Sequence, residues 1–368
     1  MTQTRVHPRL SAGGLEKIKA EFDGQISAGL HPASALAVYV DGKLAVDLVG
    51  GVMGRSPDSP VAHDSLFRVF SCGKPLAAAC LWVLKERGKV GWDDPVIKHW
   101  PGFRSHGKDR VTVRHVLTHQ AGLPTTPREL QGNRAMSDWS RVVAAMENAR
   151  LEYEPGSRIQ YHPATFGWLV AELVTCISGR PFTEFFRDNV AAPLGLHDTR
   201  YVLPAPLNGR VVKLKAMPGM EPPDVPDRWN DERSYSVSVP GGSCISTARD
   251  TARFHAALVG GGRMDGVAWL KPETVAEVTA LAVEGVDQVN GSYQRRTLGM
   301  AMPASEPDRT GAGPQSKVFS HGGLATSITW GDPALGVACS SLTAGMQPSE
   351  TDRDRHFRIS TAVRKALS

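Results

Sequence analysis

The chain has 368 residues, of which 41% are hydrophobic and 21% are charged, and its formal net charge is +5 from 42 basic and 37 acidic residues. This composition is that of an ordinary globular protein with enough chain for a large core or two apposed subdomains, and it excludes a mainly disordered chain. Basic and acidic residues are interspersed, so no basic stretch predicts a nucleic-acid interface.

The N-terminal part of the chain predicts a helix followed by a hairpin. Between residues 14 and 29, apolar residues recur every three to four positions, as on one face of an amphipathic helix. Residues 35–40 and 43–49 are two apolar runs joined by Asp41-Gly42. This dipeptide tolerates the positive φ angles of a tight turn, so the two runs are predicted to pair as a hairpin.

A buried helix and a helical middle come next. Residues 76–84 form a continuous apolar run that ends near Gly88, which predicts a buried helix closed by a left-handed glycine. The proline-rich stretch 203–240 has little periodicity and predicts a long ordered loop or a lid. Helical patterns occupy residues 111–119, 137–149, 164–178, 181–191 and 247–259.

The C-terminal part predicts short strands and a last helix over residues 352–367. Turns are predicted at Gly322-Gly323 and Asp332-Pro333. The predicted strands cover residues 317–321, 326–330 and 336–342.

Strands at both ends and helices between them predict an α+β fold, with an antiparallel sheet flanked by helices and a mainly helical subdomain. We expect residues 1–88 and 300–368 to form the α/β sandwich subdomain. Residues 89–299 are expected to form the helical subdomain with the lid-like loop 203–240.

The first chemical motif is Ser71-Cys72-Gly73-Lys74, an S-x-x-K sequence directly before the predicted buried helix. Three residues are nearly one helical turn, so the amine of Lys74 would reach the hydroxyl of Ser71. Burial would lower the lysine pKa from about 10.4 and make the amine a base. The helix N-terminus would favour an oxyanion at Ser71. The alternative interpretation is that Ser71 only caps the helix.

A second match, Ser105-His106-Gly107-Lys108, shows that the pattern alone has low specificity. It lies in a polar loop with no apolar helix behind it, so we expect Lys108 to remain unburied and the pair to remain unfixed. Cys72 has no histidine next to it in sequence, and we interpret it as a packed residue and not as a catalytic thiol.

Two further motifs follow in chain order, Tyr161-His162-Pro163 and His321-Gly322-Gly323. With the first motif, they resemble the serine β-lactamase and penicillin-binding protein superfamily, in particular class C lactamases and family VIII carboxylesterases. The resemblance covers nearly the whole chain. Other segments that look like the family are residues 111–124 (VTVRHVLTHQAGLP), 193–199 (PLGLHDT) and 241–254 (GGSCISTARDTARF).

The resemblance implies a β-lactamase-like fold and acyl transfer without a metal or cofactor. Ser71 would be the nucleophile, Lys74 would help to remove its proton, and Tyr161 would pass a proton to the leaving group. Backbone N–H groups of Ser71 and Leu324 would form the oxyanion hole.

Five further residues are candidates for substrate binding: His321, Gly322, Gly323, Gln120 and Trp229. His321-Gly322-Gly323 matches the strand where lactamases carry K-T-G and family VIII esterases often carry W-G-G. Alternative interpretations are a structural strand histidine for His321 and loop packing for His119 and Gln120. For Trp229 the alternative is core packing.

Two departures from the lactamase pattern favour an ester substrate. Pro163 replaces the asparagine whose amide binds the drug, and proline supplies neither a side-chain amide nor a backbone N–H. His321, only partly charged near neutral pH, replaces the lysine that pairs with the drug's carboxylate. The predicted function is therefore a serine carboxylesterase for small to medium esters. Alternatives are an amidase, D-aminopeptidase, transacylase or weak β-lactamase on the same site, or a non-catalytic scaffold.

The remaining signals concern metals and location. The sequence contains neither G-x-S-x-G nor H-E-x-x-H, and no metal cluster is predicted. Its five cysteines form no C-x-x-C pair, and an odd number argues against a disulfide framework. Residues 1–14 lack an apolar signal core, and no apolar stretch is long enough to span a bilayer. We expect a cytoplasmic protein with a small-molecule ester substrate and no membrane or nucleic-acid partner; homo-oligomerisation stays open.

Overall fold

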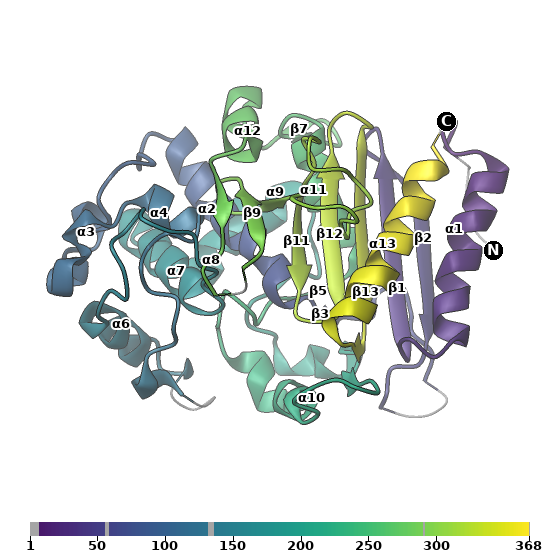
Figure 1. The fold of residues 1–368 in the computed structure, drawn as a ribbon, viewed down its shortest axis with the longest axis horizontal. Coiled ribbons are helices and arrows are strands. Elements are labelled where there is room, and N and C mark those ends of the chain that lie inside the picture. Colours follow the sequence, from purple (N-terminus) through teal and green to yellow (C-terminus); the bar gives the residue numbers. More distant parts are fainter. Residues whose placement is uncertain (1–6, 56–58, 132–135, 290, 368) are drawn as a thin grey trace.

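An eight-stranded sheet built from both ends of the chain forms the centre of the fold in the computed structural model (Figure 1). The structure describes residues 7–55, 59–131, 136–289 and 291–367, so the first six residues of the segment inspected for a signal core lie outside it. All neighbouring strands are antiparallel. The strand order is β2 (Lys43–Gly51), β1 (Ala33–Val40), β13 (Val337–Thr343), β12 (Ser327–Asp332), β11 (Phe319–Gly323), β10 (Ala301–Met302), β9 (Tyr293–Arg296) and β8 (Val283–Val286).

Helices cover both faces of this sheet. Successive side chains of a strand point to opposite faces. In β1, Leu36 and Val38 belong to one apolar cluster with helices α1 (Ala12–Ser27) and α13 (Ser349–Lys365). Ala35 and Ala37 belong to the other cluster, with helix α11 (Ala248–Val259). The strand is therefore buried on both faces, as its nearly continuous apolar sequence requires.

The predicted hairpin and the predicted buried helix are confirmed. Asp41 and Gly42 have φ angles of 48° and 75°, and they connect β1 to β2. Helix α2 (Gly73–Glu86) is buried at every position from Gly73 to Leu84, and Gly88 beyond it has a φ of 68°. A helix with no exposed face is fixed on all sides, so it holds its N-terminal residues in place.

The middle of the chain is mainly helical, as predicted. Helix α7 (Thr165–Ser178) packs against α2. The stretch 203–240 contains β4 (Lys215–Ala216) and α10 (Val225–Asn230) between irregular segments. No described helix has both the length and the apolar character needed to cross a bilayer. The other helices are α3 (Val96–His99), α4 (Val113–Leu117), α6 (Trp139–Asn148), α8 (Phe182–Phe186), α9 (Ala192–Leu194) and α12 (Pro272–Thr279).

Two features differ from the sequence-based expectation. Strands β8 and β9 lie between residues 283 and 296, within the range expected to be helical, and they extend the sheet. The predicted turn at Gly322-Gly323 is wrong, because both glycines belong to β11 and the chain turns later, at Ala325 (φ 52°). Gly323 serves close packing instead, since a Cβ there would lie 2.6 Å from the carbonyl oxygen of Val69. The subdomain boundaries stay a prediction.

A buried ion cluster ties α13 to the sheet. The fully buried carboxylate of Asp352 lies 2.8 Å from Arg355 and 2.9 Å from Arg309. Burial alone would raise the pKa of Asp352, but His356, Arg309 and Arg355 outweigh it and hold this pKa below its ordinary value. Arg355 also donates to the carbonyl oxygen of Ala325 at 2.8 Å, so the cluster supports the turn after β11.

We expect Asp352→Asn to lower the free energy of unfolding by about 3–5 kcal/mol, because it leaves Arg355 buried without its carboxylate. The folded-state pKa of Asp352 is depressed, so its stabilisation is complete above the ordinary carboxyl pKa and is lost as the pH falls below it. Urea unfolding at neutral pH and at about pH 2.5, well below the ordinary carboxyl pKa, measures both effects. The wild type should lose more stability on acidification than the variant.

The matched control is Asp354→Asn on the same helix. Asp354 is exposed and pairs with Arg358 at 3.1 Å, so its loss should change stability by no more than about 0.5 kcal/mol. Equal destabilisation by both substitutions would contradict the role of the buried cluster.

Candidate active site

A cleft of about 1040 Å³ contains Ser71 and Tyr161 among its lining residues. Strands β9, β10 and β11 contribute to its wall. The stretch 203–240 contributes Met220 and Trp229, among others. The cleft therefore brings together the first and the last of the three sequence motifs, at Ser71 and at His321.

Three predicted side chains meet at one oxygen. The hydroxyl oxygen of Ser71 lies 2.9 Å from the Nζ of Lys74 and 2.8 Å from the phenol oxygen of Tyr161. Both distances are within hydrogen-bond range. The arrangement lets a proton leave the serine for one group while the other group stays in contact with the same oxygen.

The amine of Lys74 is fully buried and is held by backbone carbonyls. It donates to the oxygen of Pro163 and to the oxygen of Gly241, each at 2.7 Å. A neutral amine has two N–H groups and one lone pair. The amine also donates to the Ser71 oxygen at 2.9 Å; in the neutral form, the two N–H groups would stay on the carbonyls and the lone pair would be left for Ser71. Burial, above all, lowers the pKa of Lys74, and the charge of Arg296 acts in the same direction against the influence of Tyr161.

Ser71 lies on a strained turn at the entrance to α2. Ser71 is in a short 3₁₀ turn, η1 (Phe70–Cys72), which runs directly into the helix. Phe70 has a φ of 48°, a left-handed conformation that is costly for a bulky residue and that the surroundings must maintain. Its ring packs edge-on against Trp229, with 5.4 Å between the ring centroids.

The second S-x-x-K segment differs from this arrangement, although not for the reason expected. Lys108 is fully buried, which corrects the prediction, and burial lowers its pKa to about 8. Its amine donates to the carbonyl oxygen of Glu147 at 2.8 Å, at the end of α6. Ser105 is exposed, and the left-handed residues His106 and Gly107 interrupt the helical turn that would align serine and lysine.

Strand β11 lies directly against the η1 turn that contains Ser71. The thiol of Cys72 donates to the carbonyl oxygen of His321 at 3.0 Å, and Gly323 contacts the backbone of Val69. Burial raises the pKa of Cys72 to about 11, as expected for a packed thiol and not for a reactive thiolate. Leu324, the predicted second oxyanion donor, follows this strand and lines the cleft.

Three histidines surround Tyr161, and burial lowers the pKa of each. His321 is 4% exposed and lines the cleft, and its pKa is well below the ordinary value, so it is uncharged at neutral pH and not partly charged as expected. The ring of His119 lies 4.7 Å from that of Tyr161, and its Nδ1 accepts the N–H of His162 at 3.1 Å. These histidines are neutral, so they add no positive charge to the site.

Two predicted substrate-binding residues have different outcomes. Gln120 is not among the described residues that line the cleft; its amide donates to the oxygen of Gly156 at 3.1 Å and accepts from Thr118 at 2.9 Å. The expectation that it binds substrate is therefore replaced by the loop-packing alternative. Trp229 does line the cleft, and it lies over the buried guanidinium of Arg68 at 4.7 Å.

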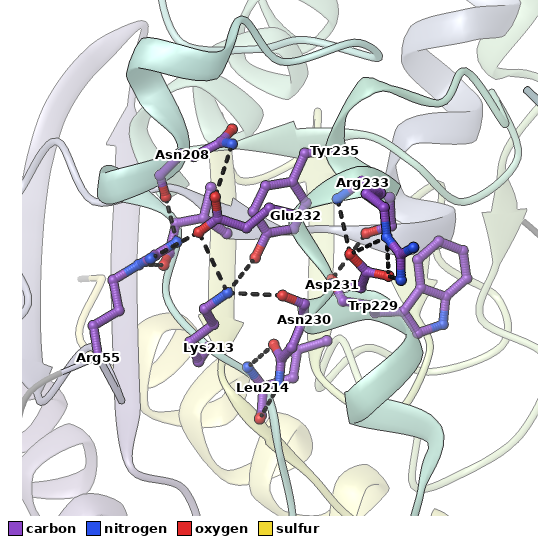
Figure 2. Close-up of polar contacts among 12 residues, drawn as sticks. Arg55, Asn208, Lys213, Leu214, Trp229, Asn230, Asp231, Glu232, Arg233 and Tyr235 are labelled. Atoms are coloured by element: carbon purple, nitrogen blue, oxygen red, sulfur yellow. Dashed lines mark hydrogen bonds and ion pairs between the residues drawn. The ribbon is translucent and has the colours of Figure 1, made fainter.

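The segment that carries Trp229 is anchored by a polar cluster, shown in Figure 2. Lys213 donates to the oxygen of Asn230 at 2.7 Å and to the hydroxyl of Tyr235 at 3.3 Å. The Asn230 side chain forms two hydrogen bonds of 2.8 Å with the backbone of Leu214. This part of the predicted lid is therefore an ordered wall of the cleft.

Three parts of the site were not predicted from the sequence: Arg296, Asp287 and the carbonyl of Gly241. Asp287 accepts the backbone N–H of Tyr161 at 3.0 Å, and Arg296 lies over the tyrosine ring. Residues 293–296 read Tyr-Gln-Arg-Arg and show no alternation of apolar and polar residues, so the sequence carried no signal that Arg296 faces inward. No group of three metal-ligating side chains occurs among the described residues.

Comparison with known proteins identifies the class. Residues 22–363 match the family model described as Beta-lactamase, so the chain belongs to the beta-lactamase family. It is accordingly an enzyme, a serine hydrolase with the β-lactamase-like fold that the sequence predicted.

Individual relatives include esterases. Esterase/beta-lactamase LipL of Mycobacterium tuberculosis is 29% identical over 342 residues, which are 83% of this chain and 75% of that protein. Esterase EstB of Burkholderia gladioli is 28% identical over 206 residues, 52% of each chain. The crystal structure of a family VIII carboxylesterase has a TM-score of 0.89 at 26% identity and covers 97% of this chain and 99% of that one. A penicillin-binding protein homolog from Caulobacter crescentus has a TM-score of 0.87 at 27% identity, with the same coverage.

The two glycines of β11 provide a matched pair of substitutions. A Cβ at Gly323 would meet the rigid backbone of Val69, whereas a Cβ at Gly322 would meet the flexible end of Arg309 at 2.8 Å. We expect Gly323→Ala to reduce kcat/KM by about 100-fold or more, because it displaces the strand from the nucleophile turn. Gly322→Ala should keep most of the activity. Steady-state kinetics with thermal melts would test this, and equal activity of the two variants would contradict it.

Proposed function

We propose that the protein is a carboxylesterase that hydrolyses small to medium esters through an acyl-enzyme on Ser71. The observation that carries the proposal is the position of the Ser71 hydroxyl within 2.9 Å of both a buried amine and a phenol. The names of the relatives LipL and EstB and of the carboxylesterase structure support it.

In the acylation step, Ser71 attacks the ester carbonyl while its proton moves to the lone pair of Lys74. Negative charge develops on the carbonyl oxygen, where the backbone N–H groups of Ser71 and Leu324 would stabilise it. Tyr161 donates its proton to the departing alkoxide, and the proton held by Lys74 restores the phenol. The alcohol leaves, and the acyl group stays on Ser71.

In the deacylation step, water attacks the acyl carbonyl and gives one proton to the Lys74–Tyr161 pair. Collapse of the second tetrahedral intermediate breaks the ester bond to Ser71, whose oxygen takes that proton back. One ester and one water thus become one acid and one alcohol, and the enzyme returns to its initial state.

An uncharged ester fits the charge of the cleft better than an anionic lactam does. His321 is neutral where lactamases have a cation, and Pro163 has no side-chain amide. The carbonyl of Pro163 is also occupied by Lys74. The β-lactamase activity in the name of LipL makes weak lactam hydrolysis the second candidate. Turnover of nitrocefin and of a short 4-nitrophenyl ester, measured on the same preparation, discriminates between them, and faster nitrocefin turnover would reject the ester assignment.

The five unpaired cysteines, four of them buried, support our proposal of a reducing, cytoplasmic location. A fusion to a reporter that reads the compartment would test it.

We expect Ser71→Ala to reduce ester hydrolysis by roughly 10³-fold or more, because no other group can form the acyl-enzyme. Ser105→Ala is the matched control, since it removes the serine of the second S-x-x-K at an exposed position. It should leave the rate unchanged. Rapid-mixing kinetics with a 4-nitrophenyl ester should show a burst of one equivalent in the wild type and in the control. Undiminished turnover by the Ser71 variant would refute the mechanism.

The apolar wall around Trp229 should limit the length of the ester. It belongs to a cluster with Phe70, Leu214, Met220 and Met346. We expect Trp229→Ala to raise the ratio of kcat/KM for octanoyl over acetyl esters by about tenfold, because it opens space and leaves the Ser71 contacts intact. Because the octanoyl-to-acetyl ratio is taken within each enzyme preparation, differences in the fraction of active enzyme between preparations cancel. An unchanged ratio would show that Trp229 does not contact the substrate.

A further inference from the structure

A second buried cation lies next to the proton carriers. Arg296, the last residue of β9, is 7% exposed and lines the cleft. Its guanidinium carbon lies 5.5 Å from the centroid of the Tyr161 ring. The Nζ of Lys74 lies 5.0 Å from the same centroid. Two basic side chains therefore lie near one phenol, in a part of the protein with little access to water.

No carboxylate pairs directly with Arg296 within the described ranges. Its Nη2 donates to the amide oxygen of Gln294 at 2.7 Å, and its buried Nε has no hydrogen-bond partner there. The nearby acid Asp287 uses one carboxylate oxygen for the N–H of Tyr161 and the other for the N–H of Val289. The charge of Asp287 offsets part of the guanidinium charge of Arg296, and the remainder acts on the neighbours of Arg296.

The three buried histidines and the cysteine around Lys74 are uncharged at neutral pH. Burial holds the pKa of His119 and His321 well below the ordinary value and lowers that of His162 to about 4. Burial raises the pKa of the Cys72 thiol to about 11. The groups around Lys74 come from several elements. The turn η1 contributes Ser71 and Cys72, the loop after α4 contributes His119, and the segment before α7 contributes Tyr161 and His162. The sheet contributes Arg296 from β9, His321 from β11 and Asp287 directly after β8.

We propose that Arg296 is a positioning residue for the reaction at Ser71: its permanent positive charge keeps Lys74 in the free-base form that accepts the serine proton. A guanidinium does not give up its proton in proteins. Two like charges in a desolvated site disfavour each other, so the lysine is the group that loses its charge. This inference depends on the proposed acyl-enzyme mechanism and specifies how the base of that mechanism is maintained.

The hydrogen bonds of Lys74 agree with this assignment. In the free-base form, the carbonyls of Pro163 and Gly241 would satisfy both N–H groups of the amine and would leave its lone pair for the Ser71 oxygen, 2.9 Å away. Arg296 is also well placed to replace a cation that β11 lacks. In the sheet, Arg296 lies opposite Ala301, and Ala301 lies opposite Ser320, the neighbour of His321. The charge therefore lies two strands away from the neutral histidine.

The test is the pH dependence of kcat/KM with a neutral 4-nitrophenyl ester for the wild type, Arg296→Gln and Arg296→Lys. Without the positive charge, the ammonium form of Lys74 becomes more stable and its pKa rises. The acid limb of the Arg296→Gln profile should therefore move up by about one pH unit, with roughly tenfold lower activity at pH values below the wild-type limb and recovery at alkaline pH. Arg296→Lys keeps the charge and should keep the position of the limb.

The matched control is Arg295→Gln on the same strand. Arg295 makes a 3.3 Å ion pair with Glu284 and donates to the oxygen of Pro303. This substitution makes the same change in net charge and should not move the acid limb. A purely structural role of Arg296 would lower activity equally at all pH values. An unmoved limb in Arg296→Gln, or equal shifts in the two glutamine variants, would overturn the proposal. If Arg296→Gln does not fold, Arg296→Met provides an uncharged side chain that packs more easily.

A second readout separates this inference from the proposed function. The rate at which a fluorophosphonate labels Ser71 depends on activation of the hydroxyl but requires no ester substrate. If the wild type hydrolyses no ester, the esterase proposal fails, and the pH profile of labelling still tests Arg296. If ester turnover requires Ser71 but both profiles keep their acid limb in Arg296→Gln, the inference fails while the proposed function stands.

Discussion

The burial of the Lys74 amine is the constraint on which the rest of the site depends. Within the described residues the amine has no carboxylate partner, and three oxygens surround it. A charged amine in such a place would cost several kcal/mol, so the neutral form is favoured. The protein must therefore exclude water from the lysine and leave Ser71 open to the cleft. A helix buried on all sides meets the first condition, and the position of Ser71 at its first turn meets the second.

Two glycines make this enclosure possible. The carbonyls that bind Lys74 come from Pro163 and Gly241, in segments far apart in the chain. A Cβ at Gly167 of α7 would overlap the backbone of Gly241, and a Cβ at Gly241 would lie 2.7 Å from the oxygen of Pro163. The close backbone approach that glycine permits thus brings both carbonyls to one amine. On the side of β11, the backbone is strained at Phe70 and Ala325, two non-glycine residues with positive φ.

The parts of the fold and of the site that could be predicted from the sequence are those that local patterns determine. The Asp41-Gly42 turn and the apolar run after Ser71 each depend on neighbours in sequence, so propensity and periodicity sufficed. The S-x-x-K spacing likewise placed Lys74 beside Ser71. By contrast, Gly323 looked like a turn because its close partner, Val69, is distant in sequence. Lys108 looked exposed for the same reason, since the carbonyls that bury it belong to α6 and its end. Strands β8 and β9 are short, and they are stabilised by pairing in the sheet and by contacts with the distant residue Ile159, which local patterns do not reveal.

The positions of the charges explain how the same site can contain cations and still suit an uncharged substrate. In a cleft where β11 carried a cation, the charge would face the substrate, and an anionic group would compensate it. Here the histidine of β11 is neutral, and the guanidinium of Arg296 lies against the ring of Tyr161. Arg296 lines the cleft together with Trp229, and its position against the phenol ring brings its charge close to the groups that move protons. The charge that supports the base therefore lies at the phenol and not on β11. Residues of the apolar wall can change, and with them the preferred ester, without loss of the reactivity of Ser71.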